Sequence, residues 1–458
     1  MRTWIKNPLA VWTGNDLNAD GGIVVDDGMI AEILESGDSP AETVAVEFDA
    51  SGLIVLPGLI NCHHHFYQTL TRAFPAALNK ELFPWLKALY PVWAGLDEEC
   101  IALSTELALA ELMLSGCSTA SDHHYLFTDE VADAVDIQVS VARRLGARVL
   151  LTRGSMSLGD SDGGLPPDSV VQDADTILAE SERLIGTHHD AAEDAFVQIA
   201  LAPCSPFSVT PELMRDSAAL AREHGVLLHT HLAETSDENE FCLARFGKRP
   251  LDYLDELGWL ADDVWVAHGI HFDDDEIARL GAARTGIAHC PSSNMVLASG
   301  LCRTRELEAS GVPIGLGVDG SASNDCSNMM QEVRQAFLLQ RLRYGAANIT
   351  HHDALRWATT GGAAVLHRQR LGSIAPGQCA DLALFDLAEL RFSGSGDPLA
   401  ALVTCGAHRV RHLMIGGEWR VSNGEIPGVD LEQLSASHRQ MAAKLAGKAC
   451  SPAATSGA

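Results

Sequence analysis

The sequence has few basic residues for its length, and this shortage narrows the range of possible partners. Its 458 residues include 32 lysines and arginines against 61 aspartates and glutamates, which gives a formal net charge of -29. A chain this acidic is repelled by nucleic-acid phosphates and by anionic membrane surfaces. We therefore expect neither a nucleic-acid polymer nor a membrane as partner, and any nucleobase substrate should be a free small molecule.

Long apolar runs and paired cysteines are also missing. No segment has 18 uninterrupted apolar residues, and residues 1–6 lack the apolar core of a secretory signal peptide. The eleven cysteines are scattered, without a C-x-x-C pair or the short spacings of a disulfide framework. These absences predict a cytoplasmic protein whose cysteines are free thiols or small buried side chains.

The two ends of the chain share one sequence pattern. Short β-branched runs punctuated by turn residues occur at 22–25 and 29–33, and again at 380–386 and 410–415. Such runs indicate antiparallel strands joined by tight turns. We expect residues 1–56 and 379–450 to form one small β-sandwich domain built from both termini, and residues 451–458 to be a disordered tail.

Between these ends, apolar runs alternate with segments of helical period. The eight runs are 59–62, 119–123, 149–153, 197–202, 226–231, 264–268, 286–289 and 314–318. Eight βα units predict a (β/α)8 TIM barrel over residues 57–378, with the active site at the carboxyl ends of its strands. The alternative is a doubly wound open sheet, but no G-x-G-x-x-G follows the first strand.

Six of the eight predicted strands end in ionisable residues. These are His63 and His65, His123, His231, His268, His289 and Asp319. His63 and His65, two positions apart, leave the same face of a strand, whereas His64 points away. Three consecutive histidines can also be solvated loop residues. The other strand ends favour a shared cavity, and closure of the barrel would make Asp319 a neighbour of His63.

The residue types at this rim indicate hydrolytic metal chemistry. Three histidines and a carboxylate suit zinc, or iron in a similar role, which would lower the pKa of a bound water from 15.7 toward ~7. His229 shares a face with His231, but only His231 is at the mouth, so we place His229 in a lower packing layer. Glu234 is placed to carry protons, or else is the first-turn acid of the next helix.

Several motifs together resemble the amidohydrolase superfamily, in its subgroup of guanine, cytosine and adenosine-analogue deaminases and s-triazine hydrolases. The matching segments are 57–65, 229–235, 266–269, 289–294, 317–320 and 371–382. The resemblance covers nearly the whole chain. It implies one divalent metal ion, held by His63, His65, His231 and Asp319, with catalytic roles for Glu234, His268 and Asp319 and substrate binding by Glu234 and His268. No lysine follows the fourth strand, which favours a mononuclear deaminase.

Residues 61–93 are more specifically similar to the 8-oxoguanine deaminases of this subgroup, which form urate and ammonia. That similarity implies a small heterocyclic substrate contacted by Gln68, with Tyr67 and Trp85 stacking on or covering its ring. Gln68 could instead cap the following segment, and both rings could be core residues. One departure is Val296, where many relatives have lysine. Guanine or isocytosine deamination and s-triazine hydrolysis remain alternatives, and the resemblance also implies a homo-oligomer.

Overall fold

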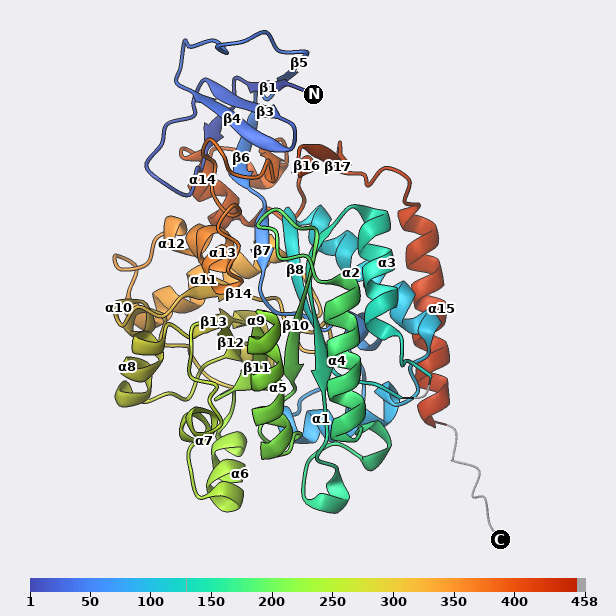
Figure 1. The fold of residues 1–458 in the computed structure, drawn as a ribbon. Helices are drawn as coiled ribbons and strands as arrows, with labels where there is room; N and C mark the ends of the chain where they lie inside the picture. The colour runs from blue at the N-terminus through green and yellow to red at the C-terminus, as the bar shows by residue number, and fades with distance from the viewer. Residues whose placement is uncertain (129, 451–458) are drawn as a thin grey trace.

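A closed barrel of eight parallel strands forms the centre of the computed structural model, which describes residues 1–128 and 130–450 (Figure 1). The strands are β7 (Leu59–Asn61), β8 (Cys117–His124), β9 (Arg148–Ser155), β10 (Val197–Pro203), β11 (Leu228–Leu232), β12 (Val264–His268), β13 (Gly286–His289) and β14 (Ile314–Leu316). All eight coincide with predicted apolar runs. The predicted (β/α)8 fold is confirmed.

Helices surround the barrel and follow its strands in the chain. They include α2 (Glu98–Leu114), α3 (Ala134–Leu145), α4 (Ala174–His188), α5 (Pro211–His224), α6 (Ser236–Phe246), α7 (Pro250–Glu256), α8 (Asp274–Ala283), α9 (Pro291–Val296), α10 (Thr304–Ala309), α11 (Met329–Tyr344), α12 (His351–Arg356) and α13 (Gly362–Val365). Local signals set their ends. Thr210 caps α5 by accepting from Leu213 N–H, and Gly225 ends this helix with a φ of 64°.

The barrel closes where β14 pairs with β7. Leu316 is in register with Asn61, and the Cys62 N–H donates to the Leu316 carbonyl at 2.8 Å. Just beyond the strands, the Asp319 N–H donates to the His63 carbonyl at 3.0 Å. This seam brings the first and last strands of the barrel together at their carboxyl ends, as the sequence predicted.

Two further sheets form a β-sandwich from both chain ends. One sheet has the order β4-β3-β1-β5 and the other β17-β16-β15-β6-β2. Their strands are β1 (Thr3–Lys6), β2 (Ala10–Val11), β3 (Gly22–Asp26), β4 (Met29–Leu34), β5 (Val46–Asp49), β6 (Leu53–Pro57), β15 (Leu382–Asp386), β16 (His412–Ile415) and β17 (Glu418–Ser422). Ile5 and Ile23 of the first sheet share a core with Val55 and Leu384 of the second. The predicted sandwich is confirmed.

A buried ion pair links the sandwich to the barrel. Arg148, at the start of β9, donates from Nε and Nη2 to the two carboxylate oxygens of Asp381, each at 3.1 Å. The Gly416 N–H donates to the same carboxylate at 2.8 Å. Because both charged side chains are buried, this contact holds β15 and β16 against the base of the barrel.

The C-terminal helix α15 (Leu431–Cys450) packs against α2 and the short helix η1 (Phe66–Thr71) beside the barrel (Figure 1). The predicted domain boundaries at 56 and 379 remain predictions, and the predicted tail 451–458 lies outside the described residues. No helix among the described residues is both long and apolar enough to cross a membrane. The ten cysteines whose side chains the structure describes are free.

Candidate active site

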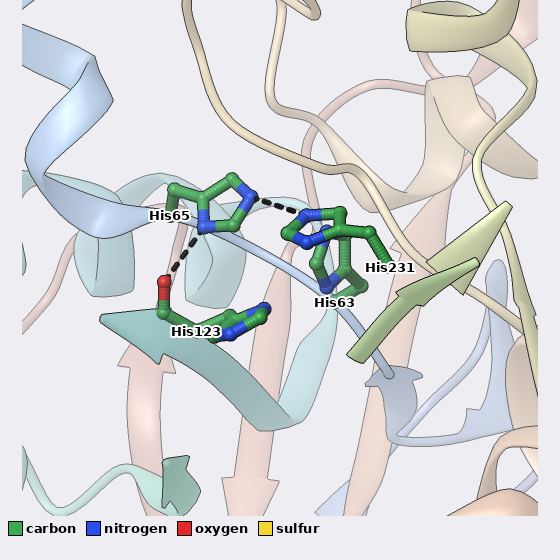
Figure 2. Close-up of side chains that lie close together, drawn as sticks. All are labelled: His63, His65, His123 and His231. Atoms are coloured by element: carbon green, nitrogen blue, oxygen red, sulfur yellow. Dashed lines mark hydrogen bonds between the residues drawn. The ribbon is translucent and has the colours of Figure 1, made fainter. Parts of the chain in front are cut away.

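Buried histidines from three strands face one another at the carboxyl end of the barrel (Figure 2). His65 Nε2 lies 3.2 Å from His231 Nε2 and 3.3 Å from Asp319 Oδ1. His63 Nε2 lies 3.2 Å from the same Asp319 oxygen. The fold therefore brings together the four residues that the family resemblance implies as ligands, although they follow or belong to the first, fifth and last strands of the barrel.

Hydrogen bonds to backbone carbonyls orient two of these rings. His65 Nδ1 donates to the His123 carbonyl and His231 Nδ1 donates to the Cys204 carbonyl, each at 2.7 Å. A carbonyl oxygen can only accept, and a neutral imidazole has one N–H, so the Nε2 atoms of both rings carry lone pairs. These two lone pairs and the Asp319 oxygen meet without a hydrogen between them.

Burial disfavours the charged form of two histidines in the cluster. It lowers the pKa of His63 and His231 well below the usual histidine value, because a charged imidazolium loses its hydration inside the barrel. Neutral imidazoles are the form that binds metal ions. Two overlapping groups of buried side chains have ligand atoms close enough to hold a metal ion: His63, His65, His123 and His231, and His63, His231, His268 and Asp319. Imidazole nitrogens and a carboxylate suit a divalent metal ion, which would relieve the contact between lone pairs.

A second pair of titratable groups, Glu234 and His268, stands beside this cluster. Glu234 Oε2 lies 3.5 Å from His268 Nε2, and His268 Nε2 lies 3.8 Å from Asp319 Oδ2. Burial, followed by the charge of Asp319, raises the pKa of Glu234 well above its usual range. This shift favours the protonated carboxylic acid, which is the form that can donate a proton.

The backbone around Glu234 is held in an unusual turn. Ala233 has a φ of 52°, and both its N–H and that of Glu234 donate to the carboxylate of Glu238 at 2.9 Å. Glu238 is fully buried at the start of α6. His268 also has a positive φ, 74°, and its Nδ1 lies 3.0 Å from Asn294 Oδ1. The second pair is thus positioned by buried partners from α6 and α9.

A cavity opens onto the cluster. Its lining residues are His65, Gln68, Leu82, Trp85, Leu86, Tyr90, Tyr125, Cys204, Phe207, His231, Glu234, His268, Leu297, Asp319 and Ser323. Helix α1 (Leu82–Trp93) supplies four of them, and Trp85 Nε1 donates to the Ala322 carbonyl at 3.3 Å. The cavity joins one polar end to walls that are mostly apolar, which suits a small heterocyclic ring.

Comparison with known proteins assigns the chain to a family. The model of the amidohydrolase family matches residues 54–420. The chain belongs to the amidohydrolase family. It is 63% identical to the 8-oxoguanine deaminase of Pseudomonas aeruginosa, over 97% of this chain and 99% of that protein. It is 40% identical to the hydroxydechloroatrazine ethylaminohydrolase of Pseudomonas sp. (strain ADP), over 84% of this chain and 81% of that protein.

A solved amidohydrolase structure supports the same assignment. The atrazine chlorohydrolase of Arthrobacter aurescens, complexed with zinc, superposes with a TM-score of 0.88 and 30% sequence identity. The superposition covers 96% of this chain and 100% of the chlorohydrolase chain. The likeness therefore includes the β-sandwich as well as the barrel.

The predicted substrate contacts divide into two groups in this amidohydrolase. Gln68, Trp85, Glu234 and His268 line the cavity. The structure does not bring Tyr67 to it; the Tyr67 ring packs edge-on against Trp93 at a centroid distance of 5.3 Å. A Cβ on Gly320 would lie 1.9 Å from Gln68 Oε1, so this glycine makes room for the Gln68 amide.

Four polar residues at strand ends, His123, His124, Arg153 and His289, lie outside the cavity lining. His123 Nε2 donates to the Ala202 carbonyl, His124 Nε2 donates to the Leu126 carbonyl, and the Arg153 guanidinium stacks over Phe127 at 3.8 Å. His289 Nε2 lies 3.2 Å from the Gln340 amide. The His123 ring also stacks on His231, at a centroid distance of 4.8 Å.

Sequence reasoning missed much of the cavity wall. Tyr90, Tyr125, Cys204, Phe207, Leu297 and Ser323 come from loops and helices that follow the strands. No periodicity marks such positions. One signal was available for Cys204. It directly follows β10, the fourth barrel strand, and residues at the same position on other barrel strands belong to the site.

Proposed function

We propose that this amidohydrolase deaminates a free aminopurine, 8-oxoguanine, to urate and ammonia. The observation that carries the proposal is the 63% identity, over nearly the full length of both chains, to an 8-oxoguanine deaminase. The reaction consumes one water: the bond between the ring carbon and its amino nitrogen breaks, a carbonyl forms at that carbon, and ammonia leaves.

The shape and charge of the cavity support a planar neutral base. Its walls include Leu86, Tyr90, Phe207 and Leu297, and among the described lining residues none is lysine or arginine. A nucleotide would bring a phosphate that no lining cation neutralises. The Gln68 amide can both donate to and accept from the edge of a purine.

The proposed metal ligands are His63, His65, His231 and Asp319, and the proposed ion is one zinc per chain. The opposed lone pairs at 3.2 Å and 3.3 Å support a cation here, and a zinc-complexed relative has the same fold. A bound zinc lowers the pKa of water to about 7 and so supplies hydroxide at neutral pH. Metal analysis of the purified protein distinguishes zinc from iron.

The proton transfers are assigned to Glu234 and His268. Glu234 donates its proton to the ring nitrogen next to the carbon that water attacks, and the carboxylate then passes the water's proton to the departing amino group. His268, 3.5 Å from Glu234, binds the oxygen that is added to the ring carbon and can exchange a proton with Glu234. Asp319 accepts the other proton of the attacking water, and this proton returns to Glu234 before the next turnover, which restores the acid.

A substrate panel tests this proposal. Ammonia release is measured with 8-oxoguanine, guanine, isocytosine and a hydroxylated s-triazine, and urate is followed by its absorbance. We expect kcat/KM for 8-oxoguanine to exceed the others by roughly 100-fold, a ratio that substrate hydrogen bonds can supply. Preferential release of alkylamine from the triazine would overturn the proposal in favour of the activity named for the ethylaminohydrolase.

A further inference from the structure

His229 is a buried histidine directly below the cluster, and none of the proposed steps uses it. It lies in β11, two residues before His231, and is fully buried. Its Nδ1 lies 2.9 Å from the Trp265 carbonyl oxygen. Since that oxygen can only accept, Nδ1 carries the hydrogen, and the Nε2 of the neutral ring carries a lone pair.

The lone pair of His229 determines where His63 carries its own hydrogen. His63 Nδ1 lies 2.8 Å from His229 Nε2, so His63 Nδ1 is the donor of this bond. The other nitrogen of His63, Nε2, then carries a lone pair. It is buried without a hydrogen-bond partner among the described residues and faces Asp319 Oδ1 at 3.2 Å. The Trp265 carbonyl in β12 thus determines, through His229, which ring nitrogen of His63 carries the hydrogen.

Trp265 contacts both His229 and the backbone next to His63. Its ring stacks on His229 with a centroid distance of 4.3 Å and an interplanar angle of 15°. Its indole Nε1 donates to the carbonyl of Cys62, the residue before His63, at 3.1 Å. The distance between the His63 backbone and the His229 ring is therefore fixed by one rigid side chain, which leaves little freedom for the His63 ring to turn.

We propose that His229 is a positioning residue that fixes the tautomer of His63 and thereby strengthens metal binding. The inference rests on the proposed metal site. His229 is not itself a ligand, because each of its nitrogens is occupied by a hydrogen bond. Metal-ligating histidines are usually held by a carboxylate, a carbonyl or water, and here a neutral imidazole takes that place.

Metal affinity, measured apart from activity, tests this role. Zinc dissociation constants are measured by competition with a chromophoric chelator for the wild-type chain, His229→Phe and His229→Gln. Phenylalanine keeps the ring but has no acceptor, and we expect zinc to bind about 10- to 100-fold more weakly. Glutamine can accept from His63 through Oε1 and donate to Trp265 through Nε2, so it should recover most of the loss.

A matched control removes another buried imidazole of the barrel. His289→Phe alters a residue at the end of β13 that contacts Gln340 and none of the proposed ligands, and it should leave zinc affinity unchanged. Thermal unfolding of the metal-free proteins identifies any variant that fails to fold. If His229→Phe does not fold, His229→Leu replaces it with the same expectation.

The outcomes separate this inference from the proposed function. Wild-type zinc affinity in the folded phenylalanine or leucine variant would overturn the positioning role and leave the metal site intact. Equal losses for glutamine and phenylalanine would overturn it too, because only glutamine keeps the acceptor. A wild-type chain that binds no zinc would overturn both the metal site and the inference.

Discussion

Asp319 Oδ1 and His63 Nε2 lie 3.2 Å apart across the seam where β14 meets β7. Closing the barrel is what creates this contact, because the two residues follow the last and the first of its strands. The proposed catalytic site therefore exists only in the folded barrel.

Glu234→Gln should abolish most ammonia release without removing the metal. The amide keeps the size of the carboxylic acid but cannot deliver a proton to the ring nitrogen, and loss of a general acid typically costs about 10²- to 10⁴-fold. Turnover and metal content are measured on the same preparation. Unchanged turnover in a metal-loaded variant would refute the proton-transfer role.

The pH dependence of kcat should report the raised pKa of Glu234. The acid form is the proton donor and prevails below this pKa, so kcat should fall as the pH rises through it, at a higher pH than for an ordinary glutamate. Burial is the main cause of the shift. The residual rate of Glu234→Gln should lack this alkaline limb, and an identical limb in that variant would assign it to another group.

Gly320→Ala should weaken substrate binding through Gln68. The new Cβ would lie 1.9 Å from Gln68 Oε1 and push the amide away from its place in the cavity wall. We expect KM to rise about 10-fold, the effect of one lost hydrogen bond, and Gln68→Ala to give a similar rise. The double variant should be no worse than either single variant. Metal content confirms that the neighbouring Asp319 is undisturbed, and additive effects would contradict a shared cause.

Asp381→Ala should destabilise the fold rather than the chemistry. It leaves the Arg148 guanidinium buried without its carboxylate, and breaking such a pair costs about 3 to 5 kcal/mol. Denaturant unfolding measures the loss. Asp136→Ala removes the partially exposed partner of Arg183 and serves as the control, with an expected cost of about 1 kcal/mol or less. An equal loss of unfolding free energy in the two variants would mean that the Arg148–Asp381 pair does not hold the sandwich against the barrel.

The barrel and the proposed ligands could be predicted because their signals are local. Each strand is a short apolar run, and six of the eight runs end in a residue such as His231 or Asp319 whose type departs from the pattern. Parallel strands in a closed barrel end at one rim, so topology alone gathers these residues. Alternation along β11 puts His229 on the same face as His231, and we place His229 in a lower layer because only His231 is at the mouth.

The cavity wall and the hydrogen-bond relay were not predictable in the same way. Tyr67 and Gln68 are adjacent in sequence, but η1 is a 3-10 helix in which positions three apart share a face. Gln68 therefore faces the cavity together with His65, whereas the Tyr67 ring packs in the core. The role of His229 depends on its hydrogen bond to the Trp265 carbonyl in β12. No pattern within β11 shows that this carbonyl lies within reach of the His229 ring.

The most direct test of the account is the recovery of activity as metal-free protein is titrated with zinc, with 8-oxoguanine as the substrate. We predict that the metal-free chain forms no urate, and that urate and ammonia appear in equal amounts and reach a plateau at one zinc per chain. Full turnover by the metal-free protein, or no urate at any zinc loading, would contradict the account.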